Sequence, residues 1–375
     1  MEEVKEELSP KALVNSGSSL LVPSVKELAK EQLTEIPSRY IRFDQESPVT
    51  TFQPTCLPSV PVIDIHSLLF QESEAATASE LNRLHSACKN WGFFQIINHG
   101  VSSSLIEKIK LEIKAFFELP MEEKQKLWQQ PCDQEGFGQL FVVSEEQKLD
   151  WCDMFFIRTL PTTIRKPHLF EKLPVPLRET LENYSLEMKK LAKTVLEQMA
   201  KALKMDAEEM RLLFDDGFQE MRLNYYPLCS QPEKTIGFTP HSDASALTIL
   251  LQLNETEGLQ IRNEGKWVPV KPLPNAFVVN IGDVMEIVSN GIYHSIEHRA
   301  VVNSTMERLS IATFYRTNLE AEIGPARSLI GPHKPAVFKR VMTEKYYKDF
   351  FAREIKGKSY LDSMRINGTG EEKSS

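Results

Sequence analysis

The sequence has no long apolar run, no excess of basic residues and no closely paired cysteines. None of its hydrophobic stretches approaches the roughly 20 residues that a membrane-spanning helix needs. Its first residues are acidic and lack the basic-then-apolar order of a signal peptide. The formal net charge of −8 argues against nonspecific binding to nucleic acid or to anionic membranes. The five cysteines are scattered and form no C-x-x-C pair, so we expect free thiols in a cytoplasmic protein.

The composition is that of a globular protein with a sizeable core. Hydrophobic residues make up 41% and charged residues 26% of the 375 positions. The length allows either one elaborated domain or two. We expect one catalytic core with a large N-terminal partner, divided as follows: a disordered N-terminus at 1–20, a helix-rich region at 21–215, a catalytic core at 216–318, a C-terminal helical segment at 319–366 and a disordered tail at 367–375.

Helical patterns dominate the chain up to about residue 215. Ser24 and Glu27 have the spacing of a capping box at a helix start. Apolar residues then follow a 3.6-residue period over 78–90, over about 103–117 and, longest of all, over 178–203. Two apolar runs, "VPVIDI" and "WGFFQIINHG", are typical of buried strands, and Gly136 and Gly138 suggest a turn.

The pattern changes at "EMRLNYYPL", where short apolar runs separated by turn signals begin. These include "ALTILLQL", "GLQIR", "AFVVNI", "DVMEIVSN" and "LSIATFY". Many short strands favour a barrel or a double-sheet jelly roll, and cupin-like jelly rolls carry metals inside. We therefore predict a mixed α+β fold with a double-stranded β-helix (cupin-like jelly roll) core, a helix-rich N-terminal region and a C-terminal helix.

Three residues of this strand-rich part have the pattern of a metal site. His241 and Asp243 are two apart, so an extended backbone directs both side chains to one face. His298 is a candidate third ligand, but His294 would share its face in a strand, so spacing leaves the two open. Two imidazoles and one carboxylate form the facial triad that binds Fe(II) and leaves positions free for a cosubstrate and O₂. Arg308 and Ser310 repeat the two-residue spacing and are suited to hold a carboxylate.

The motifs "NYYP", "HSDASALTIL", "NGIYHSIEHRA" and "RLSIATF" resemble those of plant Fe(II)/2-oxoglutarate-dependent dioxygenases. Further stretches, such as "EGFGQ", "LDWCDMFF" and "KSYLDSMRI", are similar to the subgroup of the senescence-related dioxygenase and the benzylisoquinoline alkaloid O-demethylases. The resemblance runs from about Leu21 to Ile366. It implies that His298 is the third metal ligand, because the family uses the histidine of the "HR" pair.

The resemblance also implies the roles of further residues. The far carboxylate of 2-oxoglutarate would be bound by Arg308 and Ser310, assisted by Asn224 and Tyr226. A mostly apolar substrate pocket would consist of Phe141, Val142, Ala244, Phe314 and Tyr315, which suits a hydrophobic small molecule.

The expected function is therefore hydroxylation, O-demethylation or desaturation of a plant specialised metabolite, with Fe(II), 2-oxoglutarate and O₂, supported by ascorbate. We expect a monomer that binds neither nucleic acid nor membrane. Three alternatives remain open from the sequence: an oxidase with the same triad but without 2-oxoglutarate, a metal-dependent condensing enzyme, and a non-catalytic binding protein.

Overall fold

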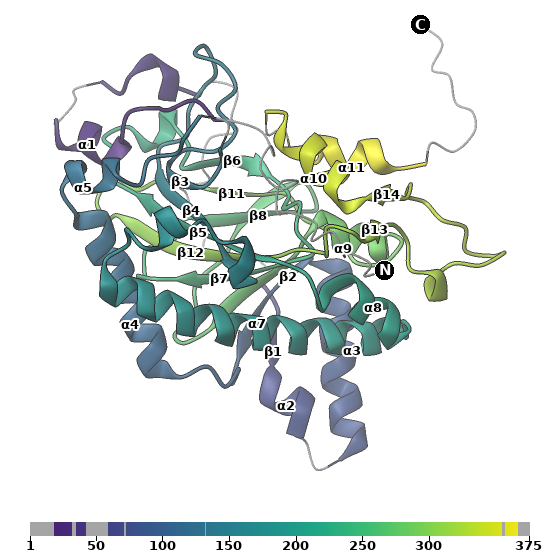
Figure 1. The fold of residues 1–375 in the computed structure, drawn as a ribbon. Coiled ribbons are helices and arrows are strands. Elements are labelled where there is room, and N and C mark those ends of the chain that lie inside the picture. The colour runs from purple at the N-terminus through teal and green to yellow at the C-terminus, as the bar shows by residue number, and fades with distance from the viewer. Residues whose placement is uncertain are drawn as a thin grey trace, which may run out of the picture.

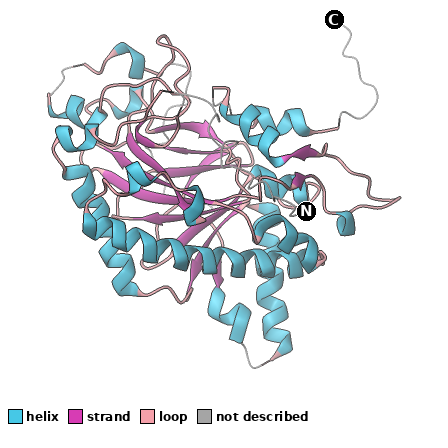
Figure 2. Ribbon diagram, in the orientation of Figure 1, coloured by secondary structure: helices cyan, strands magenta, loops and turns pink. Residues whose placement is uncertain are grey.

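A computed structural model describes residues 19–31, 35–42, 59–70, 73–131, 133–354 and 357–366. The disordered ends predicted at 1–20 and 367–375 lie outside these residues, apart from Ser19 and Leu20. Two β-sheets form the centre of the molecule, and helices surround them (Figures 1 and 2).

The larger sheet has eight strands in the order β1-β2-β10-β7-β12-β5-β4-β3, and the smaller has four in the order β6-β11-β8-β9. A third sheet consists of two short strands, β13 and β14. The strands are β1 (Val62–Asp64), β2 (Phe93–Ile97), β3 (Gly136–Gly138), β4 (Asp153–Leu160), β5 (Gln219–Tyr226), β6 (Phe238–His241), β7 (Leu247–Gln252), β8 (Leu259–Asn263), β9 (Lys266–Pro269), β10 (Phe277–Ile281), β11 (His298–Ala300), β12 (Arg308–Tyr315), β13 (Glu322–Ile323) and β14 (Val341–Met342).

One helix dominates the outer face of the larger sheet. Helix α7 packs along α3 and α4 and against β4 and β7 (Figure 1). The periodic apolar residues of α7 are buried in the main hydrophobic core, as the 3.6-residue pattern predicted. The helices are α1 (Val25–Lys30), α2 (Ile65–Phe70), α3 (Glu74–Asn90), α4 (Ser103–Glu118), α5 (Met121–Gln125), α6 (Pro167–Phe170), α7 (Val175–Leu203), α8 (Ala207–Phe214), α9 (Asp283–Val288), α10 (Thr343–Phe351) and α11 (Ser359–Met364). None of the helices in the described ranges is both long and apolar enough to span a membrane.

Strand β12 shows how the larger sheet separates core from site. Its odd-numbered residues Leu309, Ile311 and Tyr315 belong to the hydrophobic core shared with α7. Its even-numbered residues instead line a cavity between the two sheets. Because side chains alternate along a strand, one face of β12 contributes to the hydrophobic core and the other lines the candidate site.

Several local predictions need correction. Residues 283–288, expected as part of an apolar strand, form helix α9, and every residue of it is buried. A short run of mostly apolar residues does not distinguish a buried strand from a buried helix. Gly136 and Gly138 lie in β3 rather than in a turn. The helix-rich N-terminal region also supplies β1 to β4, and β2 and β4 pair directly with β10 and β5. Strands from both sides of residue 215 therefore belong to one sheet.

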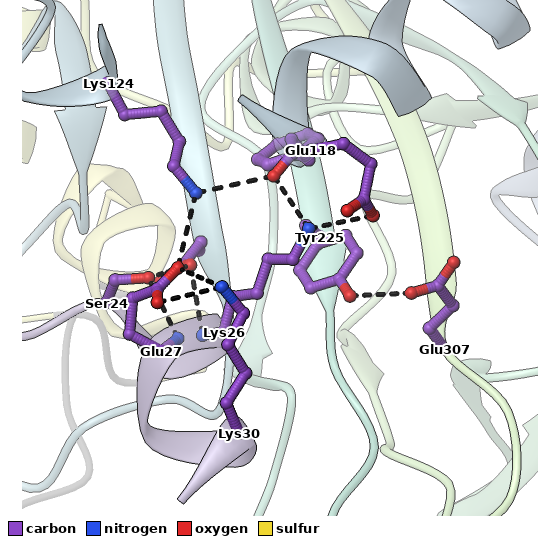
Figure 3. Close-up of polar contacts among 10 residues, drawn as sticks. Ser24, Lys26, Glu27, Lys30, Glu118, Lys124, Tyr225 and Glu307 are labelled. Atoms are coloured by element: carbon purple, nitrogen blue, oxygen red, sulfur yellow. Dashed lines mark hydrogen bonds and ion pairs between the residues drawn. The ribbon is translucent and has the colours of Figure 1, made fainter. Parts of the chain in front are cut away.

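The first described helix is attached to the larger sheet by a buried polar cluster (Figure 3). The Ser24 hydroxyl oxygen accepts a hydrogen bond from the Glu27 amide at 3.4 Å, as expected for the predicted cap. Asp153, at the start of β4, accepts hydrogen bonds from the Ser24 hydroxyl at 2.6 Å and from the amides of Val25 and Lys26 at 2.7 and 3.2 Å. One buried carboxylate therefore satisfies the first turn of α1 and fixes it to the sheet.

Candidate metal and cosubstrate site

Strand pairing brings the two predicted imidazole ligands together. His241 ends β6 and His298 begins β11, and the two residues are direct partners in the antiparallel register. Their ring centroids are 4.2 Å apart. Asp243 follows β6, and its Oδ1 lies 3.5 Å from His241 Nε2 and 3.7 Å from His298 Nε2. One ligand atom from each residue lies within 4.8 Å of the others, and all three side chains are buried.

The backbone orients both imidazole rings. Nδ1 of His241 lies 2.8 Å from the Thr239 carbonyl, and Nδ1 of His298 lies 3.1 Å from the Ile296 carbonyl. A carbonyl can only accept, so each Nδ1 carries the proton and each Nε2 keeps its lone pair directed at the shared centre. This is the orientation that metal-binding histidines require.

Asp243 accepts hydrogen bonds from two polar residues that the sequence analysis did not predict. Its Oδ2 accepts the Thr248 hydroxyl at 2.6 Å and the Asn280 amide at 2.8 Å. Oδ1 is thereby left for the histidines. A signal for both residues exists in the sequence, because each is a polar side chain inside an otherwise apolar strand, "LTILLQ" and "FVVNI".

The electrostatics of the three residues suit a divalent cation. Burial would raise the pKa of Asp243, but His298, His241 and the hydrogen bond from Thr248 outweigh it and hold the pKa well below the usual carboxyl range. Burial and the neighbouring His241 lower the pKa of His298 to about 4, against the opposing effect of Asp243. At neutral pH the site therefore offers an ionised carboxylate and a neutral imidazole at His298, the donor types of the Fe(II) facial triad.

His294, the rival ligand, is exposed and does not belong to this group. Strand β11 begins only at His298, so the shared face that a longer strand would have produced does not exist.

The four residues predicted to hold the cosubstrate lie on paired strands. Arg308 of β12 is opposite Tyr226 of β5, and Ser310 is opposite Asn224. Asn224 Nδ2 lies 3.3 Å from Ser310 Oγ. All four line the same cavity as His241, Asp243 and His298. The cavity therefore joins a candidate metal site to a guanidinium.

Arg308 lines this cavity and is buried. Only 3% of the residue is exposed. One terminal nitrogen donates to Gln252 Oε1 at 3.3 Å, and the guanidinium carbon lies 5.1 Å from the centre of the Tyr226 ring. Within the described ranges, Arg308 Nε is buried and has no hydrogen-bond partner. Burial lowers the pKa of Arg308, so an anionic ligand would relieve a cost that the protein itself leaves in place.

A second hollow adjoins the metal site. Its lining does not include Arg308, and the residues that it shares with the first are Arg222, Phe238, His241, Asp243 and Phe314. Three of the residues predicted for a substrate pocket, Phe141, Ala244 and Phe314, line the second hollow. Further aromatic lining residues were not predicted, and they are Phe156, Phe238, Phe350 and Phe351. The ring of Phe141 stacks on Phe351 of α10 with centroids 5.5 Å apart, so the C-terminal helix forms part of the wall.

The structure does not place Val142 and Tyr315 in this hollow. Val142 packs in a separate cluster with Trp151, because the chain bends at Phe141, whose φ is +65°. Tyr315 lies on the helix-facing side of β12, one residue out of phase with Phe314. The resemblance predicted the correct segments. The backbone conformation determines which residue of each adjacent pair, Phe141 or Val142 and Phe314 or Tyr315, lines the hollow.

Arg222 is a charged residue in the wall that the sequence reading also missed. It lies opposite Ala312 in the sheet and borders both hollows. Its guanidinium carbon lies 3.8 Å from the centre of the Phe238 ring. Its Nε is buried, with no hydrogen-bond partner in the described part of the chain. The aromatic wall thus contains a buried guanidinium donor that borders both hollows.

Comparison with known proteins agrees with this geometry. Residues 217–317 match the model of the 2OG-Fe(II) oxygenase superfamily, and residues 60–174 match the model of the N-terminal region of non-haem dioxygenases in morphine synthesis. Protein SRG1 of Arabidopsis thaliana is 54% identical, covering 93% of this chain and 98% of its own length. Codeine O-demethylase of Papaver somniferum is 55% identical, covering 94% and 99%.

Among solved structures, JOX2 in complex with 2OG, Fe and JA is 32% identical and superimposes with a TM-score of 0.83 over 94% of this chain and all of its own. The predicted jelly-roll fold is thereby confirmed. The family match, the identity over nearly the whole length of the relatives and the common fold, together with the triad found in this chain, show that it belongs to the 2OG-Fe(II) oxygenase superfamily as a non-haem iron dioxygenase.

Proposed function

We propose that this dioxygenase oxidises a hydrophobic aromatic metabolite by hydroxylation, O-demethylation or desaturation, and releases succinate and CO₂ from 2-oxoglutarate. The observation that carries the proposal is the junction of three features. The triad and the unpartnered Nε of Arg308 lie at one cavity, and the adjoining phenylalanine-lined hollow shares His241 and Asp243 with it.

Each group of residues then has a separate task. His241, Asp243 and His298 would hold Fe(II), which supplies O₂ activation when bound. The Arg308 guanidinium and the Ser310 hydroxyl bind the far carboxylate of 2-oxoglutarate, while Asn224 holds Ser310 and Tyr226 supports Arg308. Because Arg308 is buried, its attraction for that carboxylate is screened little by solvent.

The wall of the second hollow indicates the type of substrate. Six phenylalanine rings exclude water and favour a flat apolar molecule, and Arg222 offers a donor to one oxygen of that molecule. The relatives include codeine O-demethylase and a flavonoid 7-O-demethylase of Ocimum basilicum, which is 54% identical over 93% of this chain and 92% of its own length. These names favour O-methylated aromatic compounds as first candidates.

The test incubates purified protein with Fe(II), 2-oxoglutarate, O₂ and a panel of O-methylated flavonoids and alkaloids. We expect succinate to form in step with product. A product that has lost one CH₂ unit, accompanied by formaldehyde, indicates demethylation, and one that has gained an oxygen atom indicates hydroxylation. Turnover without 2-oxoglutarate would contradict the proposal and favour an oxidase.

A second candidate function is metal-dependent condensation, because S-norcoclaurine synthase 1 of Coptis japonica is 44% identical over 95% of this chain and 99% of its own length. Product formation under anaerobic conditions with a redox-inert metal would favour it. Support by ascorbate, a monomeric state and a cytoplasmic location stay predictions from the sequence.

A further inference from the structure

We propose that Gly258 is a positioning residue for the cosubstrate clamp, because its missing side chain leaves the space through which Arg308 reaches the cavity. The inference rests on the proposed role of Arg308 in binding 2-oxoglutarate. Gly258 lies directly before β8, in the smaller sheet, and faces the start of β12 in the larger one.

The backbone gives no other reason for glycine at this position. The φ angle of Gly258 lies outside the left-handed region, so an L-residue could adopt its conformation. A Cβ atom there would, however, lie 2.7 Å from Arg308 Cδ, 3.2 Å from Arg308 Nε and 2.9 Å from the Val301 carbonyl oxygen. Two of these separations are shorter than carbon contacts allow.

Arg308 cannot easily move away from such a methyl group. The Tyr226 ring lies against its guanidinium, and Gln252 Oε1 accepts a hydrogen bond from one of its terminal nitrogens. The amide nitrogen of Gln252 is itself committed to the Thr256 carbonyl at 2.6 Å, which fixes Oε1 toward Arg308. The guanidinium is therefore enclosed on several sides.

The backbone on either side of Arg308 is equally fixed. The Glu307 carbonyl accepts the Asn254 amide at 2.8 Å and the Thr256 hydroxyl at 2.7 Å. The Leu309 amide donates to Asn254 Oδ1 at 3.2 Å. The segment from Gln252 to Gly258 thus wraps around Arg308 and determines where its charge lies.

A methyl group at position 258 would act on the part of Arg308 that the ligand needs. It would push against Cδ and lie beside Nε, the donor without a protein partner. A diacid held at one end by the metal tolerates little displacement of the group that holds its other end. We therefore expect Gly258→Ala to weaken 2-oxoglutarate binding by about 10-fold or more. For comparison, misplacement of a positioning group by about 1 Å can lower a reaction rate by as much as 100-fold.

The experiment measures the dissociation constant of 2-oxoglutarate calorimetrically with Mn(II)-loaded full-length protein. The matched control is Gly331→Ala, because Gly331 has open space around its Cβ position and no left-handed φ. We expect the control to bind 2-oxoglutarate as the unmodified protein does. We expect both variants to keep their Mn(II) affinity, because none of the ligands contacts either glycine.

A double variant separates positioning from a general structural effect. Lysine at 308 keeps Cδ but has no Nε donor, and its flexible end can compensate for a displaced Cδ. Gly258→Ala should therefore weaken 2-oxoglutarate binding by less than about 3-fold in an Arg308→Lys background. An equal loss in both backgrounds, or a matching loss of Mn(II) affinity, would overturn the proposal. If Gly258→Ala does not fold, recovery of folding by Arg308→Ala supports the predicted clash, and failure to recover assigns the clash to Val301 and overturns it.

The same measurements test the proposed function separately. If Arg308→Lys alone binds 2-oxoglutarate as tightly as the unmodified protein, Arg308 is not the clamp and the proposed function loses its anion site. If Arg308→Lys weakens binding but Gly258→Ala does not, the clamp stands and only the role of Gly258 is wrong.

Discussion

The carboxylate of Asp243 has one oxygen for the candidate metal and one for the protein. Thr248 and Asn280 bind Oδ2, so rotation that would withdraw Oδ1 from the histidines breaks two short hydrogen bonds. The two imidazoles are fixed in the same way by backbone carbonyls. At the residue scale, the site is preorganised by neighbours that need not touch the metal.

We predict that His298→Ala abolishes stoichiometric iron binding and lowers metal affinity by more than about 100-fold, the upper end of the loss expected for a supporting residue. His294→Ala is the matched control, because His294 is an exposed histidine four positions away. Metal content after dialysis checks both variants. Iron loss in the His294 variant alone would show that the ligand assignment is wrong.

Spacing and resemblance predicted the positions of the triad and the clamp, but spacing alone left His294 and His298 open. The ambiguity came from assuming that a strand ran through both residues, and only the start of β11 at His298 removes it. The supports Thr248, Asn280 and Gln252 were not predicted. Their roles depend on pairing between strands that are distant in sequence, and a single sequence contains no record of that pairing.

At the scale of elements, β12 combines two functions through its alternation. Leu309 and Ile311 contribute to the core under α7, whereas Arg308, Ser310 and Phe314 face the cavities. A slip of one residue in the pairing with β5 would exchange these two sets. The register is therefore required for both stability and chemistry.

Two substitutions three positions apart should separate these functions. Ile311→Ala should lower the free energy of unfolding by about 2–5 kcal/mol because it leaves a cavity in the core, while the dissociation constant for 2-oxoglutarate stays unchanged. Phe314→Ala should instead raise the KM for the aromatic substrate by about 10-fold or more, since it removes buried ring surface from the pocket. Urea unfolding and steady-state kinetics measure the two effects. A loss of stability in the Phe314 variant as large as that in the Ile311 variant would contradict the division.

Helix α9 shows where element prediction from sequence fails. Its six residues are all buried, including Glu286, which binds Lys358 at 2.9 Å and Arg365 at 2.6 Å. An isolated carboxylate among apolar residues would normally mark the exposed face of a strand. Here it is neutralised by the C-terminal segment, a contact that local periodicity does not reveal.

At the scale of the whole molecule, Asp153 joins the first helix to the catalytic sheet. Lys26 and Lys124 lie beside Glu27 and Glu118 around this junction, and the hydroxyl of Tyr225 donates to Glu307 at 2.6 Å near the start of β12 (Figure 3). The N-terminal segment also shares a hydrophobic cluster with Tyr226, through Val25 and Tyr40. The outer layer therefore supports the residue against which Arg308 rests.

We predict that Asp153→Ala destabilises the protein by about 2–4 kcal/mol, because the Ser24 hydroxyl and the buried amides of Val25 and Lys26 lose their acceptor. Hydrogen exchange should increase at residues 25–30 before the rest of the chain opens. Glu118→Gln is the control, since Glu118 is half exposed and its ion pair with Lys26 should contribute less than about 1 kcal/mol. Unchanged exchange in α1 of the Asp153 variant would show that the helix is held by other contacts.

The continuous sheet also limits how this enzyme can be engineered. The residues that line the proposed substrate hollow come from both sides of residue 215, with Phe141 and Phe156 before it and Arg222 and Phe314 after it. A chimera joined there with a relative would inherit half of its pocket from each parent. In such a chimera, β2 would also have to pair with β10, and β4 with β5, although the two strands of each pair come from different parents. Exchange of specificity is therefore better attempted by grafting single pocket residues into an intact sheet than by recombining halves of the gene.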